Sequence, residues 1–148
     1  MSAALPLTVV LVGLLAGLFA AFSYAVMPGL RRADDAAMIA AMRGINAAIA
    51  NPVFAVIFLG PLITGGLVFL VAESDVMAHV VVGYLLYLAT VAITLAVNVP
   101  LNTQLETDGQ ADAVWARARF EARWVRWNHA RTLVSLGSFV AYVWALAA

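Results

Sequence analysis

The sequence predicts an all-α membrane protein built as a bundle of four transmembrane helices, and three observations predict it. Hydrophobic residues make up 65% of the 148 residues and charged residues only 11%, whereas soluble domains are roughly half apolar and about a quarter charged. Four long stretches contain no Asp, Glu, Lys or Arg, and a helix needs about 20 such residues to cross the hydrocarbon core. All eight basic residues are arginines, and they fall in only two of the connections.

Spans that follow one another so closely must be helices, because each backbone polar group has to find its partner internally in lipid. We predict spans at about residues 5–27, 52–72, 76–99 and 131–148, with amphipathic helices at about 34–50 and 111–130. The fourth span is short, but it continues a helical pattern that begins near residue 111. We interpret residues 1–148 as one four-helix domain.

The first span is interpreted as a retained helix. It has no basic residue before it, and its apolar run is longer than the roughly 7–15 residues of a signal-peptide core. A cleaved signal peptide is the alternative.

The arginines predict the topology. They lie at positions 31, 32, 43, 117, 119, 123, 126 and 131, in the first and third connections. Because cytoplasmic connections carry the excess of basic residues, both connections are predicted to be cytoplasmic and both termini to lie outside, in a multi-pass protein of the cell (inner or plasma) membrane. A single helix over residues 111–148 would be roughly 55 Å long, so its first half is expected to extend into the cytoplasm.

Polar residues mark where three helices are expected to begin. Asp34 and Asp35 favour a start for the first amphipathic helix, whose apolar residues at 38, 42, 45 and 49 have the spacing of a helix that lies on the membrane surface. Asn51 before Pro52 predicts a capped start of the second span. Ser74 and Asp75 are expected to cap the third.

Prolines predict three interruptions of the helices. Pro28-Gly29 is expected to end the first span, and Gly60-Pro61 to kink the second. Pro100 is expected to interrupt the third span near the cytoplasmic interface, because proline lacks the backbone N–H and its ring crowds the preceding turn. The Gly13-x-x-x-Gly17 pattern in the first span favours an ordinary close contact inside the bundle over a dedicated dimerisation face.

The composition excludes several classes of function. Without cysteine, the chain has no disulfide framework, iron–sulfur cluster or thiolate metal site. The spans hold no carboxylate, which disfavours proton-coupled transporters. His79 and His129 are expected at opposite depths, so they cannot share one haem, and no metal site is predicted. Zero net charge and the lack of an aromatic-basic patch argue against nucleic acid as a partner.

Two polar stripes indicate a pocket near the cytoplasmic end of the bundle. In the third span, four polar residues fall within about 80° on a helical wheel: Tyr87, Thr90, Thr94 and Asn98. In the fourth helix, Trp124, Trp127, Asn128 and Arg131 are predicted to share one face, which Tyr142 extends through the membrane. Polar groups in an apolar zone usually face the bundle interior or a cavity. The alternative is an interfacial aromatic belt with Arg131 reaching out to lipid headgroups.

The motifs of the chain resemble those of a known family. The segments that carry the resemblance are Phe19-Ala-Ala-Phe22, Val26-Met-Pro-Gly-Leu30, Ile45-Asn46, Asn51-Pro-Val-Phe54, Asn98-Val-Pro-Leu-Asn102 and Trp124-Val-Arg-Trp-Asn-His-Ala-Arg-Thr132. Together they resemble the anthrone oxygenase-like family of small four-helix membrane proteins. The resemblance implies an oxygenase that converts an anthrone into an anthraquinone with dioxygen as co-substrate, and no cofactor is predicted.

This chemistry assigns roles to the polar residues. Arg131, Asn128, Asn98 and Asn102 are candidates for stabilising an oxyanion, and Tyr87, Tyr142 and His129 for handling a proton. Trp124 and Trp127 are expected to stack on the substrate, and Thr90, Thr94 and Asn46 complete the predicted binding residues. The expected partners are membrane lipid and a small apolar aromatic. The competing hypothesis is a non-catalytic membrane protein that binds a lipid or another hydrophobic ligand, or a small subunit of a membrane complex. A homo-oligomer is not strongly indicated.

Overall fold

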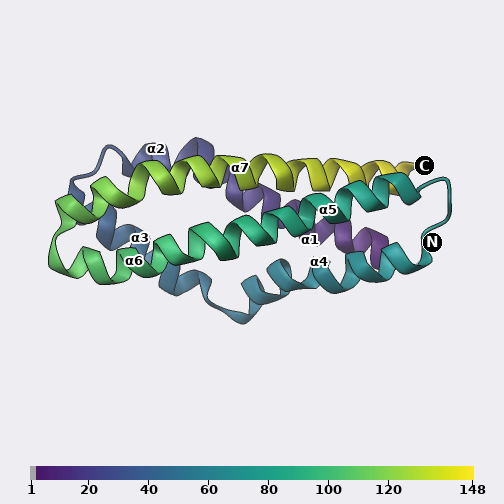
Figure 1. Cartoon of the computed structure of the whole chain (residues 1–148), viewed down its shortest axis with the longest axis horizontal. Helices are drawn as coiled ribbons and strands as arrows, with labels where there is room; N and C mark the ends of the chain where they lie inside the picture. The colour runs from purple at the N-terminus through teal and green to yellow at the C-terminus, as the bar shows by residue number, and fades with distance from the viewer. Residues whose placement is uncertain (1–2) are drawn as a thin grey trace.

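Four long helical spans make up the computed structural model, which describes residues 3–148 (Figure 1). The first span joins α1 (Ala4–Ala21), a π-helical turn η1 (Phe22–Val26) and α2 (Met27–Leu30). The second is α4 (Pro52–Val71), and the third joins α5 (Met77–Ile93), a second π-helical turn η2 (Thr94–Asn98) and α6 (Val99–Ala111). The fourth is α7 (Ala113–Ala147), and α3 (Asp35–Ile49) connects the first two spans. The predicted all-α bundle with four membrane-spanning helices is confirmed.

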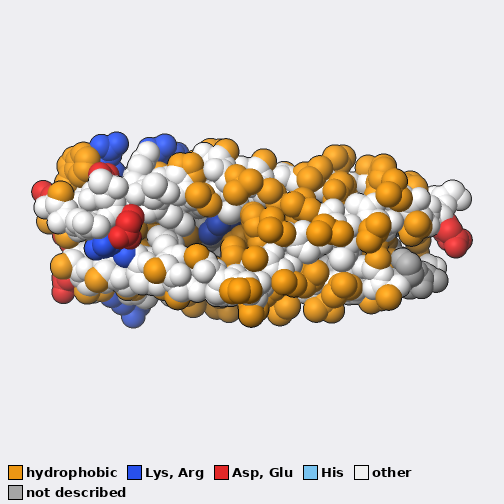
Figure 2. Space-filling view, turned by 90° about the horizontal axis from the view of Figure 1, so that it is seen from below, with side chains coloured by type: hydrophobic (Ala, Val, Ile, Leu, Met, Phe, Trp, Pro, Cys, Tyr) orange, Lys and Arg blue, Asp and Glu red, His pale blue; other side chains and the backbone are white. Residues whose placement is uncertain are grey.

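The molecule has two different ends. Helix α1 begins and α7 finishes at the same end, where the short α4–α5 connection also lies; we call this the terminal end (Figure 1). The opposite end, formed by residues 31–50 and 100–130, carries seven of the arginines, and we call it the basic end. Hydrophobic side chains cover the surface from the terminal end to past the middle of the molecule, and charged side chains gather at the basic end (Figure 2). This distribution is that of a multi-pass membrane protein with one extended polar end.

Three helices begin with an N-cap hydrogen bond from a polar side chain. Oδ1 of Asp34 accepts from the backbone N–H of Ala37 at 2.8 Å, and Oδ1 of Asn51 accepts from that of Phe54 at 3.0 Å. Asp112 caps α7 in the same way. Because these side chains satisfy N–H groups that lack a partner within the helix, they set the starts of α3, α4 and α7. The predicted cap at Ser74-Asp75 is displaced, since α5 begins at Met77 and its N-cap is Val76.

The first span ends at Leu30, directly after Pro28-Gly29, as predicted. The predicted interruption at Pro100 was wrong, because the third span continues past it to Ala111. Each proline follows a π-helical turn, in which the N–H of Met27 donates to the carbonyl of Phe22 and that of Val99 to the carbonyl of Thr94. A wider turn before proline accommodates its ring and its missing N–H without ending the helix. Pro61 lies within the unbroken α4.

The interior consists of two clusters. The first lies in the apolar part of the bundle and includes Leu15, Tyr87 and Tyr142. The second fills the basic end, where Met38, Ile39 and Met42 of α3 pack against α6 and α7. Met38 and Met42, two of the four apolar residues of the predicted amphipathic pattern, are therefore covered by α6 and α7.

Ion pairs fasten α3 to its neighbours at the basic end. Arg117 of α7 contacts Asp35 at 3.0 Å and Glu121 at 2.8 Å, and Glu121 also contacts Arg31. Arg43 of α3 donates to Glu106 of α6, and this hydrogen bond raises the pKa of the Arg43 guanidinium. These pairs are partly or largely exposed, so each contributes little alone. Together the ion pairs hold α3 in place, and residues of its last turns, Ile45, Asn46 and Ile49, line a cavity.

Candidate functional site

A cavity of about 90 Å³ lies where η1, η2, α3 and α7 meet, between the two clusters. We call it the Arg131 cavity. Its apolar lining comes from Leu18, Phe19, Phe22, Ile45, Ile49, Phe54 and Val99, and its polar and aromatic lining from Asn46, Thr94, Asn98, Asn102, Trp124 and Arg131. Both π-helical turns contribute to the wall, in agreement with the general finding that such turns occur at functional sites.

Arg131 is buried in this wall with 7% of its surface exposed. Its guanidinium carbon lies 4.0 Å from the centre of the Phe19 ring and 5.2 Å from that of the Trp124 ring. Nε donates to Oδ1 of Asn128 at 2.9 Å. Within residues 3–148, no carboxylate pairs with Arg131. A buried cation without a counter-ion is costly in a membrane protein and marks a functional position.

Two asparagines beside the cavity have unused hydrogen-bonding groups. Asn98 has 1% of its surface exposed, and neither its Oδ1 nor its Nδ2 has a partner among residues 3–148. Nδ2 of Asn46 is likewise buried and unpaired there. Because buried polar groups normally have partners, these amides are available to a molecule in the cavity. Asn102 differs, since its Oδ1 accepts from Nε1 of Trp124 at 2.8 Å and orients that ring.

The structure places the predicted site residues in three groups. Six of them line the cavity: Asn46, Thr94, Asn98, Asn102, Trp124 and Arg131. Asn128 lies behind Arg131 and contacts it without lining the cavity. The remaining five lie elsewhere: Thr90, Tyr87, Tyr142, Trp127 and His129.

These five have other surroundings. The hydroxyl of Tyr87 donates to the carbonyl of Phe58, and that of Thr90 to the carbonyl of Leu86. Tyr142 is buried between α4 and α5, near Gly65 and Gly83. Trp127 is 37% exposed and His129 is exposed as well, so both point away from the interior.

Sequence reasoning missed the contribution of the first span. Phe19 and Phe22 belong to the motif that carries the family resemblance, but they were not assigned to the site. Phe19 lies under the guanidinium of Arg131, and Phe22 packs 5.5 Å from the Trp124 ring. Ser23, which contacts Asn128, had no motif to mark it. The only signal was its position five residues before Pro28.

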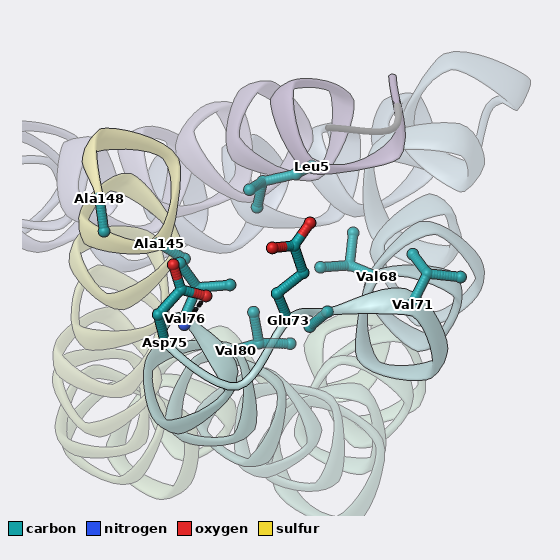
Figure 3. A pocket seen from close by; sticks show the side chains of 10 residues that line it. Leu5, Val68, Val71, Glu73, Asp75, Val76, Val80, Ala145 and Ala148 are labelled. Carbon is teal, nitrogen blue, oxygen red and sulfur yellow. Dashed lines mark hydrogen bonds between the residues drawn. The ribbon is translucent and has the colours of Figure 1, made fainter.

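A second pocket, of about 190 Å³, lies at the terminal end of the bundle (Figure 3). Its wall is apolar and includes Leu5, Val68 and Val80, while Glu73 and Asp75 stand at its rim. Both acidic residues are exposed. None of the predicted site residues lies there.

The Arg131 cavity brings together groups that can stabilise a negative charge. A fixed positive charge and free amide groups lie in an apolar enclosure, where hydrogen bonds and charges act more strongly than in water. The rings of Phe19, Phe22 and Trp124 surround it with flat apolar surfaces that suit an aromatic ligand.

Comparison with known proteins identifies the family. The family model described as anthrone oxygenase matches residues 52–141, which is more than half of the chain. The matched segment contains seven of the cavity residues: Phe54, Thr94, Asn98, Val99, Asn102, Trp124 and Arg131. No curated protein and no solved structure matches the chain. The family resemblance seen in the motifs is thereby confirmed: the chain is a four-helix membrane protein that belongs to the anthrone oxygenase family.

Proposed function

We propose that the protein is a cofactor-independent oxygenase that converts a bilayer-soluble, anthrone-type aromatic into the corresponding quinone. The observation that carries the proposal is Arg131, a cation buried between two aromatic rings with no carboxylate partner in the described chain. Such a group suits a ligand that is flat, apolar and negatively charged during reaction. The enolate of an anthrone has all three properties.

The reaction needs no redox group from the protein. Loss of a proton from the central methylene carbon leaves a carbanion whose charge is delocalised onto the keto oxygen. This carbanion reduces dioxygen and forms a carbon–oxygen bond at the same carbon, giving a hydroperoxide after protonation. The O–O bond of the hydroperoxide then breaks, and its OH group leaves as water together with the remaining hydrogen of that carbon. The second carbonyl group forms in this step. One anthrone and one dioxygen thus give one anthraquinone and one water.

The proposed role of the cavity residues is to stabilise the enolate. Arg131 lies against the developing oxyanion, and the amides of Asn98 and Asn46 supply further hydrogen bonds. A neighbouring positive charge lowers the pKa of a bound acid, so the methylene proton is released more readily in the cavity. Since Tyr87, Tyr142 and His129 do not line the cavity, we assign the proton to a water molecule that enters with the substrate.

Substrate entry requires the cavity to widen. Its volume of about 90 Å³ is well below the roughly 300–1,000 Å³ of pockets that enclose drug-sized molecules. Several partly exposed lining residues are apolar, among them Ile49, Phe54 and Val99, of which Val99 is 43% exposed. We propose that a hydrophobic substrate enters between these side chains directly from the bilayer.

Dioxygen uptake by purified protein in lipid vesicles tests the proposal. With an anthrone as substrate, we expect uptake above the rate of empty vesicles and a quinone spectrum in equal amount. Arg131→Gln should lower the protein-dependent rate by about 100-fold or more, the range seen when an oxyanion donor is removed. Arg126→Gln, which changes an exposed arginine of the same helix, should leave it unchanged.

Two results would overturn the enzyme proposal. One is an uptake rate equal to that of empty vesicles with several anthrones, while a fluorescent hydrophobe still binds to the folded protein. The other is an Arg131→Gln variant that is folded and fully active. The first result would favour the non-catalytic binding protein.

We also propose an orientation in the membrane. The basic end carries seven arginines, and the positive-inside tendency places such an end in the cytoplasm. The terminal end would then face the outside of the cell membrane, with the Arg131 cavity at the cytoplasmic side of the bilayer.

A further inference from the structure

Ser23 is the first member of a hydrogen-bonded chain that ends at Arg131. Its hydroxyl oxygen accepts from Nδ2 of Asn128 at 2.8 Å, and Oδ1 of Asn128 accepts from Nε of Arg131 at 2.9 Å. The same Nδ2 also donates to the carbonyl oxygen of Phe19 at 3.1 Å. The chain therefore connects the first span to the buried cation of the fourth through a single amide.

These contacts fix the orientation of the Asn128 amide. The carbonyl of Phe19 needs a donor, whereas the guanidinium of Arg131 needs an acceptor. If the amide were flipped, its oxygen would face the carbonyl of Phe19, and its NH₂ group would face a guanidinium that can only donate. Only the orientation that presents Oδ1 to Arg131 satisfies all three contacts.

Thr132 fixes the direction of the Ser23 hydroxyl. Oγ1 of Thr132 donates its hydrogen to the backbone carbonyl of Asn128 at 2.7 Å. The contact of 3.1 Å between the two hydroxyls therefore uses the hydrogen of Ser23, so Oγ of Ser23 is left as an acceptor toward Asn128. Each polar side-chain hydrogen of Ser23, Asn128 and Thr132 thus has one assigned acceptor, an arrangement that holds these three side chains firmly.

The π-helical turn η1 places Ser23 at this point. Ser23 is the second residue of η1, in which the hydrogen bonding changes to a spacing of five residues before Pro28. The carbonyl of Phe19 belongs to the last turn of α1, where the ordinary helical ladder ends. A carbonyl at such a transition is available to an outside donor, and Asn128 supplies that donor.

We propose that Asn128 and Ser23 are positioning residues, which hold the Arg131 guanidinium over the Phe19 ring so that both Nη groups remain free for an anionic ligand. The structure gives no protein partner to either Nη among residues 3–148. The ligand part of this inference rests on the proposed function. The positioning part does not, because the position of the guanidinium can be measured without any substrate.

Hydrogen exchange at Nε of Arg131 tests the positioning directly. In protein labelled with ¹⁵N-arginine, the resonance is identified by its absence from Arg131→Lys. We expect slow exchange in the native protein, exchange at least about tenfold faster in Asn128→Ala because about 1.4 kcal/mol of protection is a factor of ten, and an intermediate rate in Ser23→Ala. The matched control is Ser138→Ala, which removes a buried hydroxyl that donates to the Gly83 carbonyl far from the cavity. It should leave the exchange rate unchanged.

Asn128→Asp separates position from charge. The carboxylate loses both donations to the first span, but it accepts a stronger, charge-assisted hydrogen bond from Nε. Exchange should therefore stay slow, while the carboxylate neutralises the cation. A hydroxylated anthraquinone, bound as a dye, reports the loss of the Arg131 charge. Its colour shows whether its hydroxyl group is a phenol or a phenolate. The bound dye should ionise at lower pH in the native protein than in Arg131→Gln. In Ser23→Ala and Asn128→Ala, the dye should ionise at a pH between those of the native protein and Arg131→Gln. In Asn128→Asp, it should ionise at about the same pH as in Arg131→Gln.

The outcomes distinguish the two proposals. Native exchange rates in folded Asn128→Ala and Ser23→Ala would overturn the positioning role, whatever the activity. Suppose that exchange is fast in these variants and the dye shifts are seen, but the native protein takes up no dioxygen with an anthrone. This result would support the positioning role and refute the oxygenase. If the dye ionises alike in the native protein and Arg131→Gln, the anionic-ligand part of the inference fails. Should Asn128→Ala fail to fold, Ser23→Ala and Asn128→Asp still decide the question.

Discussion

Arg131 is held in the apolar part of α7 by two aromatic rings and one amide, without a carboxylate. A charged side chain at the centre of a membrane helix costs about 2.5–3.5 kcal/mol on insertion scales. Contacts with aromatic rings return about 0.5–2 kcal/mol each, and the hydrogen bond to Asn128 returns about as much. These contributions nearly cancel, so the arginine is not explained by stability.

We therefore expect Arg131→Met to separate stability from function. Methionine removes the charge and fills a similar space, at the cost of leaving Oδ1 of Asn128 unpaired. The free energy of unfolding should change by no more than about 1 kcal/mol, whereas anthrone oxidation should be lost. Unfolding in mixed micelles and dioxygen uptake provide the two measurements. A loss of about 3 kcal/mol or more would show instead that the arginine is mainly structural.

A second prediction at this scale concerns the tryptophans of α7. Trp124→Phe keeps an aromatic ring but removes the hydrogen bond to Asn102. We expect it to lower the free energy of unfolding by about 1 kcal/mol. The exposed Trp127 is the matched control, and Trp127→Phe should change the free energy of unfolding by less than about 0.5 kcal/mol. Equal effects of the two substitutions would contradict the different surroundings described for the two rings.

The sequence was sufficient to predict six of the cavity residues, because polar groups on an apolar helix tend to face its interior. The sequence does not show where the buried face of α7 ends. Trp127 lies only about 60° from Trp124 on a helical wheel, and nothing in the pattern shows that the buried arc ends between them. Tyr87 and Thr90 share the stripe of Thr94 and Asn98, but backbone carbonyls satisfy their hydroxyls.

The π-helical turns are the elements that sequence reasoning could not anticipate. Pro100 predicts a break by the usual rule, but the π-helical turn before it lets the helix continue to Ala111. The choice between a break and a wider turn depends on packing against neighbouring spans, which no local pattern contains. Capped starts were predictable at Asp34 and Asn51 because the side chain and its N–H partners are only three residues apart.

Helix packing makes a prediction about the two glycines of Gly13-x-x-x-Gly17. A Cβ added at Gly13 would lie 2.8 Å from Cε2 of Phe139 in α7, while one added at Gly17 meets nothing within 4 Å. Gly13→Ala should therefore destabilise the bundle by about 1 kcal/mol. Gly17→Ala should be neutral or slightly stabilising, because alanine favours helix. Thermal unfolding in detergent compares them. A loss of self-association in Gly17→Ala alone would indicate a dimer contact.

At the scale of the whole molecule, the composition and the distribution of charge predict the architecture well. Lipid leaves no alternative to helices for four apolar stretches, so the number of spans follows from hydropathy. The packing of α3 does not follow from hydropathy, because an amphipathic helix has the same sequence pattern whether it rests on lipid or on protein. Here α6 and α7 cover its apolar face.

The proposed orientation is tested by labelling single cysteines, which the native chain lacks. Ser74→Cys lies at the terminal end and Gln110→Cys at the basic end, and both positions are exposed. Gly109 is less suitable, because a Cβ there would lie 2.5 Å from Cγ2 of Ile39. In intact cells, a membrane-impermeant maleimide should label position 74 and spare position 110. The opposite pattern would refute the orientation, and labelling of both positions would indicate mixed insertion.

The burial of Arg131 has a consequence for how the protein is made. Helix α7 is synthesised after the other helices described here, and on its own it would expose an arginine to lipid. Its aromatic and amide partners include Phe19 and the η1 turn, which are already in the membrane when α7 arrives. We therefore expect insertion of α7 to depend on its docking on the first span. A chain with a defective first span should leave α7 poorly inserted and open to degradation.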